Sequence, residues 1–110
     1  MLVLLALLSG CSSSELDPVV AKVCAKAPCV GKFSRIRVYR DAQGEAKRLV
    51  YDGDADACRH PSRVYYDASG KTLDSIPERP VASDAKRDAL VKRQKQLVAG
   101  LDEAESLTCP

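Results

Sequence analysis

One eight-residue stretch sets the architecture of this chain: Arg37-Val38-Tyr39-Arg40-Asp41-Ala42-Gln43-Gly44, which recurs as Arg63-Val64-Tyr65-Tyr66-Asp67-Ala68-Ser69-Gly70. Six of the eight positions are identical, and the copies lie 26 residues apart. Each copy joins strand-forming residues to an Asp-Ala-x-Gly turn, in which Asp bonds to the backbone and Gly accommodates a left-handed conformation. A second candidate strand follows each turn, at 46–51 and at 71–76. The repeat therefore predicts two consecutive β-hairpins.

A short helix is expected ahead of the hairpins. Asp17 is predicted to cap it, with Pro18 at the first helical position. Apolar residues then recur on one face at helical spacing: Val20, Val23, Cys24 and Ala27. Pro28 ends the helix, because its ring would clash with the preceding turn. A helix this short does not persist alone, so we expect it to pack on the sheet.

A long amphipathic helix is predicted after the hairpins, over residues 83–107, with Ser83 or Asp84 as its cap. Its apolar stripe consists of Leu90, Leu97, Val98, Leu101 and Ala104. Gly100 is a weak point of this helix. The predicted fold class is α+β: a four-stranded antiparallel meander of two β-hairpins, flanked by a short N-terminal helix and a long C-terminal helix that lies across one face of the sheet.

The composition indicates one small domain that needs covalent support. The chain has 110 residues with no Trp and one Phe, so its core must be aliphatic and tyrosine-based. Its 17 basic and 15 acidic side chains leave a net charge of +2. This mild charge does not favour nucleic-acid binding, which usually requires a strongly basic domain. We therefore expect no nucleic-acid partner.

The N-terminal segment carries a targeting signal. Residues 1–7 are apolar, and Leu8-Ser9-Gly10-Cys11 follows them, which resembles the lipobox of bacterial lipoprotein precursors. The apolar run is too short to span a bilayer, which needs ~20 apolar residues in a helix. No Lys or Arg precedes it, so we expect the signal to begin upstream of Met1. The alternative is an ordinary tail with a free Cys11, in which exposed leucines would promote aggregation.

The resemblance to lipoprotein precursors implies an exported protein with a membrane anchor. In that family the lipobox cysteine receives diacylglycerol, the signal peptide is cleaved before it, and the new amine takes an acyl chain such as palmitate. Cys11 is therefore the implied lipidation site, and Ser12, where an Asp would imply inner-membrane retention, implies the outer membrane, periplasmic side. The expected organisation is a signal peptide at 1–10, a lipidated tether at 11–16 and one disulfide-stabilised periplasmic domain at 17–110. The N-acyl diacylglycerol would be its only bound group, with no cofactor.

The remaining cysteines are expected to form two disulfides. They are Cys24, Cys29, Cys58 and Cys109. An even number in an exported chain is typical of disulfides, and three pairings are open. Around the predicted centre of the first turn, paired positions sum to about 85, which brings Cys29 near Cys58 at the open end of the hairpin. We therefore predict Cys29–Cys58 and, by elimination, Cys24–Cys109. Zinc is the alternative, but the C-x₄-C spacing and the long gaps do not fit compact zinc motifs.

No catalytic site is indicated. The chain has one histidine, His60, in the predicted loop between the hairpins. The motifs of serine hydrolases, zinc proteases, dinucleotide-binding proteins and P-loop proteins are missing from the sequence. Its carboxylates are scattered, without an acid–base pair. We expect a protein that is not an enzyme, with a hydrolase that uses His60 as the remaining alternative.

The same loop begins with Asp at alternating positions, 52, 54 and 56, as a calcium-binding loop does. Ala57 stands where an EF-hand needs Gly, and Arg63 stands where it needs Glu. The loop therefore has the pattern of a weak cation site at best. We prefer an acidic, turn-rich loop and expect no metal.

One face of the sheet is the candidate binding face. Strand residues two apart share a face, so Arg35, Arg37 and Tyr39 should line one side, with Arg63 and Tyr65 at corresponding positions of the second repeat. If the long helix covers the other side, this face is exposed. Arg and Tyr are enriched at interface hot spots, and Arg suits acidic proteins, lipopolysaccharide phosphates or peptidoglycan carboxylates. The alternative is a charged face that merely keeps the sheet soluble, with half-buried tyrosines.

These features predict a lipid-anchored periplasmic binding module of the bacterial envelope. It would be non-enzymatic and would engage a protein partner, as an inhibitor or immunity-type protein or as an accessory subunit. The alternative is a structural envelope lipoprotein that contacts peptidoglycan or lipopolysaccharide without a specific protein partner. The two differ in whether the domain captures one protein in a fixed ratio.

Overall fold

The computed structural model describes residues 13–27, 30–54, 62–77 and 84–109. Some predicted features lie outside these ranges. They are the signal peptide with Cys11, the Cys29–Cys58 pair, His60, and Ser83 as a helix cap.

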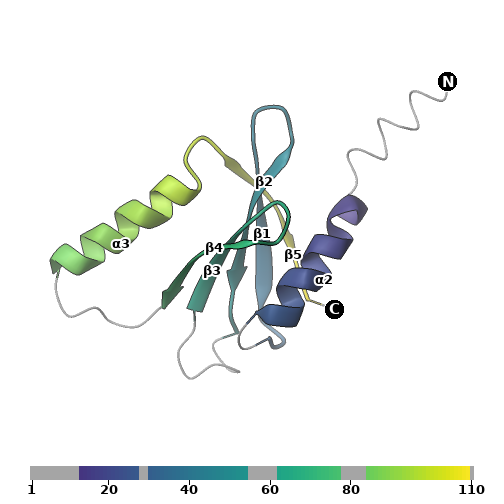
Figure 1. Cartoon of the computed structure of the whole chain (residues 1–110), viewed down its shortest axis with the longest axis horizontal. Helices are drawn as coiled ribbons and strands as arrows, with labels where there is room; N and C mark the ends of the chain where they lie inside the picture. The colour runs from purple at the N-terminus through teal and green to yellow at the C-terminus, as the bar shows by residue number, and fades with distance from the viewer. Residues whose placement is uncertain (1–12, 28–29, 55–61, 78–83, 110) are drawn as a thin grey trace.

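The described residues form a five-stranded antiparallel sheet with the strand order β4-β3-β2-β1-β5 (Figure 1). The strands are β1 (Arg35–Arg40), β2 (Ala46–Asp52), β3 (Ser62–Asp67), β4 (Thr72–Pro77) and β5 (Asp102–Leu107). Consecutive pairing of β1 with β2 and of β3 with β4 confirms both predicted hairpins and the α+β class. The fifth strand was not predicted.

The two hairpin turns have the same hydrogen bonds. In each, the amides of Asp41 and Asp67 donate to the carbonyl four residues further on, at 2.9 Å. The Oδ1 atoms of both aspartates also accept bonds from backbone amides within the turn. Gly44 and Gly70 have φ angles of 80° and 87°, a conformation that a side chain would disfavour. The repeated Asp-Ala-x-Gly motif therefore forms the turns as predicted.

The register of the first hairpin differs from the prediction by two positions. Arg37 lies opposite Val50, where the predicted register places Arg48. The turn is longer than predicted, since its closing hydrogen bond spans residues 41–45, and a register shift lies next to Arg40. Along the rest of β1 and β2, the residue numbers of each opposed pair sum to 87.

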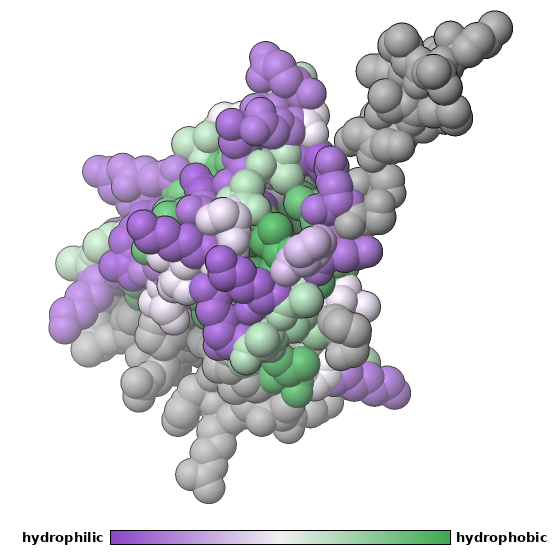
Figure 2. All heavy atoms as spheres, turned by 45° about the vertical axis from the view of Figure 1, so that its right-hand side comes forward, coloured by the Kyte–Doolittle hydropathy of each residue, from purple (hydrophilic) through white to green (hydrophobic). Residues whose placement is uncertain are grey.

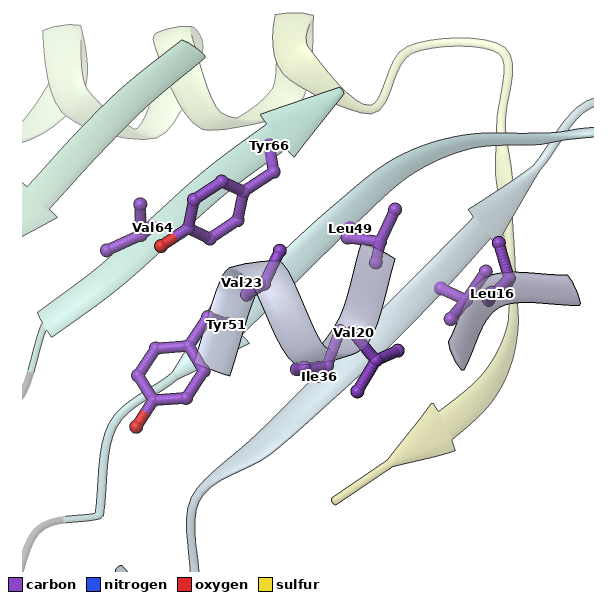
Figure 3. Packing of buried hydrophobic residues seen from close by; sticks show 9 residues of the cluster. Leu16, Val20, Val23, Ile36, Leu49, Tyr51, Val64 and Tyr66 are labelled. Atoms are coloured by element: carbon purple, nitrogen blue, oxygen red, sulfur yellow. The ribbon is translucent and has the colours of Figure 1, made fainter. Parts of the chain in front are cut away.

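One face of the sheet is covered by α2 (Asp17–Lys26), which continues directly from the 3₁₀ helix η1 (Ser13–Leu16). Leu16, Val20 and Val23 are buried against the strands (Figure 3). Their partners in this core are Ile36, Val38, Leu49, Tyr51, Val64 and Tyr66. The side chains alternate along each strand, so the apolar set faces α2 and the intervening residues face the other way.

The start of α2 differs from the prediction. Leu16 is the N-cap residue, without a side-chain hydrogen bond, and Asp17 is already helical. Because η1 runs straight into α2, there is no extended residue at which a side chain could cap the helix. Leu16 belongs to the predicted tether at 11–16, yet it lies in the core. The helix ends at Lys26 with Ala27 extended, the conformation that a following proline favours.

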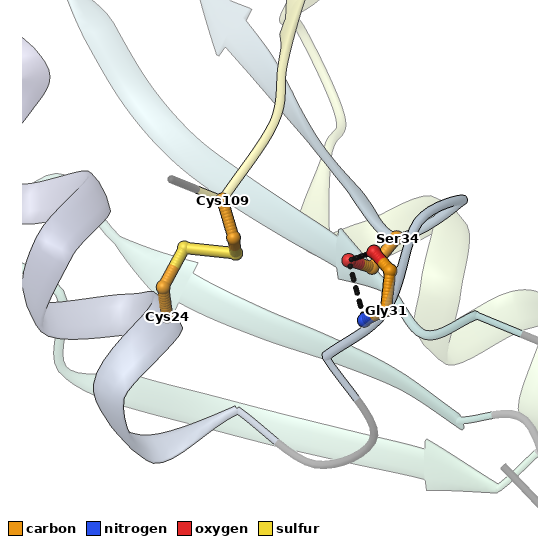
Figure 4. Close-up of a disulfide and its surroundings, with 4 residues drawn as sticks. All are labelled: Cys24, Gly31, Ser34 and Cys109. Atoms are coloured by element: carbon orange, nitrogen blue, oxygen red, sulfur yellow. Dashed lines mark hydrogen bonds between the residues drawn. A yellow bond between two sulfur atoms is a disulfide. The ribbon is translucent and has the colours of Figure 1, made fainter. Parts of the chain in front are cut away.

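A disulfide joins Cys24 of α2 to Cys109, 85 residues further along the chain (Figure 4). This bond confirms one of the two predicted pairs. Cys109 follows β5, which pairs with β1, so the bond ties the end of the chain to the helix over the core. The surface on this side is mostly hydrophilic, with hydrophobic side chains visible in small areas between the polar ones (Figure 2).

The predicted long helix over 83–107 is wrong in its second half. Helix α3 spans Asp84–Leu97, and the chain then turns and runs back as β5. Gly100 has a φ of 75°, and the Leu101 amide donates to the Val98 carbonyl at 3.1 Å in this turn. A left-handed glycine ends a helix readily. The free edge of β1 then offers the last segment a ladder of backbone hydrogen bonds.

Helix α3 lies on the sheet face opposite α2. Its apolar side chains Leu90 and Leu97, together with Val98, pack against Val50 and Tyr65. The predicted stripe is therefore confirmed in part, but it covers the face that carries the arginines, whereas we expected the opposite face. Within the described part of the chain, neither helix is both long and apolar enough to span a bilayer.

Candidate binding surface

Three arginines converge on one aspartate at one end of the α3 face. Arg35 and Arg63 both pair with Asp52 in the strand register, from β1 on one side and β3 on the other. The Nε atoms of Arg63 and Arg37 lie 2.7 and 2.8 Å from the Asp52 carboxylate, and the Nε of Arg35 lies 3.5 Å from it. We call these four residues the arginine cluster. The structure thus brings together the three arginines predicted for the binding face.

Asp52 is the member that sequence analysis missed as part of this site. We had assigned it to an acidic loop, whereas it ends β2 and faces the arginines. Three cations on one sheet face repel one another unless an anion lies between them. A carboxylate on the central strand was therefore the signal that could have located it.

The arginines differ in their exposure. The Arg37 side chain is 13% exposed and is held by Asp52 through both Nε and Nη2. The Arg35 side chain is 54% exposed and has the longest contact with the carboxylate. Arg37 is therefore part of the framework, and the Arg35 side chain is the more accessible to solvent and to a partner.

Tyr39 extends the network toward β5. The Arg37 Nη1 donates to the Tyr39 hydroxyl at 2.8 Å, and that hydroxyl donates to Glu103 Oε1 at 3.4 Å. Burial raises the pKa of the Tyr39 phenol above its ordinary value near 10, although the charge of Arg37 acts in the opposite direction. The phenol therefore stays protonated at neutral pH and keeps its role as a donor.

Tyr65 does not belong to an exposed surface. It is 3% exposed and packs beneath α3 with Val50. This corrects the predicted face, because α3 covers the part that Tyr65 occupies. The accessible part of the candidate face is the arginine cluster with the edge of Tyr39.

Arg35 is the member of this surface that a partner can reach most easily. Its side chain is the most exposed of the three arginines, and its Nε has the longest contact with the Asp52 carboxylate. A surface that carries an exposed arginine suits an acidic partner, and the described residues enclose no pocket for a small molecule.

The first two aspartates of the calcium-like pattern, Asp52 and Asp54, already bind groups of the protein itself. The carboxylate of Asp52 binds arginines, and Asp54 Oδ2 accepts a hydrogen bond from the Phe33 amide at 2.8 Å. Among the described residues, no three His, Cys, Asp or Glu side chains are grouped so that they could hold a metal ion. Asp56 and Ala57 of this pattern lie outside the described residues, as does His60.

Comparisons with known proteins were made at three levels. Family models, curated proteins and solved structures give no match to this chain. The functional argument therefore rests on the residues themselves.

Proposed function

We propose that this protein is a lipid-anchored, non-enzymatic binding module of the bacterial envelope that binds an acidic protein partner through the arginine cluster. The observation that carries the proposal is the exposed Arg35 side chain, which lies beside two further arginines that Asp52 holds in place. An inhibitor, an immunity-type protein or an accessory subunit would use such a surface.

The geometry suits carboxylates of a protein. Asp52 fixes the guanidinium groups of Arg37 and Arg63 in place, so less side-chain entropy is lost when a partner binds. A planar guanidinium matches a carboxylate with two parallel hydrogen bonds. Arginine is also enriched among the residues that dominate interface energies.

The predicted anchor lies at the other end of the domain. The described chain begins at Ser13, two residues after Cys11, so a lipid on Cys11 would hold the start of η1 at the membrane surface. The start of β1, the end of β2 and the start of β3 lie at the end of the sheet away from Ser13 (Figure 1). The arginine cluster would therefore point away from the membrane, where a periplasmic protein can reach it.

The test is affinity capture from an envelope extract, with the domain from Ser12 onward as bait. Arg35→Glu reverses the charge of the exposed arginine and leaves Arg37 in place. Lys47→Glu is the matched control, since Lys47 is also about half-exposed but lies near the opposite end of the sheet. We expect one protein in a fixed ratio, lost with Arg35→Glu and retained with Lys47→Glu. Retention with both variants would place the binding site elsewhere.

The second candidate is a structural envelope lipoprotein. The same guanidinium groups can bind the phosphates of lipopolysaccharide or the carboxylates of peptidoglycan. Capture of cell-wall fragments alone, without a stoichiometric protein, would favour this function over the first.

A further inference from the structure

The turn between α2 and β1 exposes two large apolar side chains. Phe33, the one phenylalanine of the chain, is 63% exposed, and Val30 is 44% exposed. Neither side chain belongs to the principal core, whose residues have almost no contact with solvent. Leaving an aromatic ring in water forgoes stability that burial would provide. A binding role gives this exposure a purpose.

The backbone of this turn is fixed by hydrogen bonds. The Ser34 hydroxyl donates to the Gly31 carbonyl at 2.7 Å, and the Ser34 and Gly31 amides each complete a further bond across the turn at 3.2 Å (Figure 4). The Phe33 amide donates to Asp54 Oδ2, and both Ser34 and Asp54 are buried. Rotation of this segment to bury the ring would break these bonds. The exposed position of Phe33 is therefore imposed by the fold.

Cationic groups adjoin the apolar ones. The Lys32 Nζ lies 5.5 Å from the centre of the Phe33 ring. Phe33 is two residues before Arg35, and its partner Asp54 is two residues after Asp52, so the turn continues the end of the sheet that carries the arginine cluster. Apolar and positively charged groups thus occupy one end of the domain.

We propose that residues 30–34 form an apolar anchor that inserts Phe33 into an apolar pocket, rimmed by carboxylates, on the protein partner. This inference rests on the proposed function, since the arginine cluster would contact the rim while Phe33 fills the pocket. A ring held out by a fixed backbone loses little entropy on binding. Because the chain leads to the membrane from the opposite end of the domain, a protein is the occupant that the position of the turn favours over a bilayer.

The experiment is site-specific photo-crosslinking of the intact lipoprotein in its host cells. The variant Phe33→p-benzoylphenylalanine places the reactive group in the turn. The control Leu73→p-benzoylphenylalanine uses an exposed apolar position on β4. We expect one discrete protein adduct from position 33 that position 73 does not give. No adduct, an adduct with lipid alone, or the same adducts from both positions would overturn the anchor.

Binding measurements on the captured protein complete the test. Phe33→Ala should raise the dissociation constant by about tenfold or more. Phe33→Leu should raise it by less, because leucine still fills an apolar pocket. Circular dichroism should show both variants folded. If Arg35→Glu abolishes binding while Phe33→Ala leaves it unchanged, the proposed function stands and the anchor is refuted. If the unaltered domain captures no protein, the proposed function itself fails.

Discussion

The two faces of the sheet are built differently. The face beneath α2 is a continuous apolar core, in which six strand and helix side chains are less than 2% exposed. The face beneath α3 has a small apolar contact around Val50 and Tyr65, and beyond it the arginine cluster. One face is closed by a disulfide, and the other is held by ion pairs that water reaches.

In this small domain, one face of the sheet supplies most of the stability and the other is available for recognition. Apolar burial and a covalent bond can stabilise a fold without leaving groups for a partner. Partly exposed charges contribute little to stability but can contribute much to specificity. We therefore expect changes on the α2 face to act on unfolding, and changes at the arginine cluster to act mainly on binding.

The largest effect should come from the disulfide on the α2 face. The double substitution Cys24→Ser/Cys109→Ser removes a cross-link between residues 85 positions apart. The entropy of the unfolded chain then rises, and the free energy of unfolding should fall by about 4 kcal/mol. Urea unfolding under oxidising conditions measures the change. Equal stability of the variant and the parent would show that noncovalent packing alone holds this face together.

A second disulfide would extend covalent support to the end of the sheet that carries the arginine cluster. Cys29 and Cys58 lie outside the described residues, so their pairing stays a prediction. Peptide mapping without reduction should detect Cys29–Cys58, and Cys29→Ser/Cys58→Ser should lower the free energy of unfolding by about 3 kcal/mol. Free thiols at both positions would contradict the pairing.

A pair of truncations compares the two apolar contacts directly. Ile36→Ala opens a cavity in the core under α2 and should lower the free energy of unfolding by about 3 kcal/mol. Leu90→Ala removes a half-buried side chain of α3 and should cost about 1 kcal/mol or less. Thermal and urea unfolding measure both. If Leu90→Ala were as costly as Ile36→Ala, α3 would have to form a core equal to that of α2.

Asp52→Asn should have an intermediate effect. It removes the negative charge that three arginines share, two of which are largely or partly buried. Loss of charged hydrogen bonds in a fully buried site would lower the free energy of unfolding by several kcal/mol. Because solvent reaches this site, we expect a loss of about 1–2 kcal/mol. The control is Asp74→Asn, which removes an ion pair with the half-exposed Arg93 and should cost less. Equal losses would mean that the arginine cluster adds nothing beyond an ordinary surface pair.

The hairpins could be predicted from the sequence because their signals are local. The Asp-Ala-x-Gly motif contains both the side chain that bonds the turn and the glycine that adopts its conformation. The Cys24–Cys109 pair could be inferred once the other two cysteines were assigned to the hairpin. The two-residue register error arose because the length of the turn depends on a backbone bond that the motif alone does not specify.

The error at the end of the chain has a non-local cause. Residues 102–107 have no apolar alternation that would mark a strand, and three of them are acidic. They become β5 because β1 has a free edge and because its arginines meet the acids there: the Arg40 Nη2 lies 2.6 Å from Glu105 Oε1. The position of α3 over Tyr65 follows from the same turn, since the helix must end beside the edge that β5 joins. Neither relation can be read from spacing within one segment.

The smallest effect concerns the turn of the second hairpin, which rests on the α2 face. Lys22 of α2 donates to the Ser69 carbonyl at 3.2 Å. Side-chain atoms of Lys22 and Val19 also lie within 4 Å of the position that a Cβ on Gly70 would take, whereas nothing lies within 4 Å of the corresponding position at Gly44. A hydrogen bond from the Ser69 hydroxyl to Asp67 Oδ1, and next the bond from the Lys71 amide, hold the pKa of the Asp67 carboxyl below its usual range.

Ser69→Ala should therefore raise the pKa of Asp67 toward about 3.9, the value expected for an unfolded chain. Because the folded pKa is the lower one, the stabilisation is present above the unfolded pKa and is lost as the pH falls through the folded pKa. The unaltered protein should thus exceed the variant in stability at neutral pH, and the two should converge in acid below that value. Carboxyl chemical shifts followed by NMR across the acidic range measure the pKa in both proteins. An unchanged Asp67 pKa in the variant would show that the backbone amides alone stabilise the carboxylate and that the Ser69 hydroxyl contributes nothing.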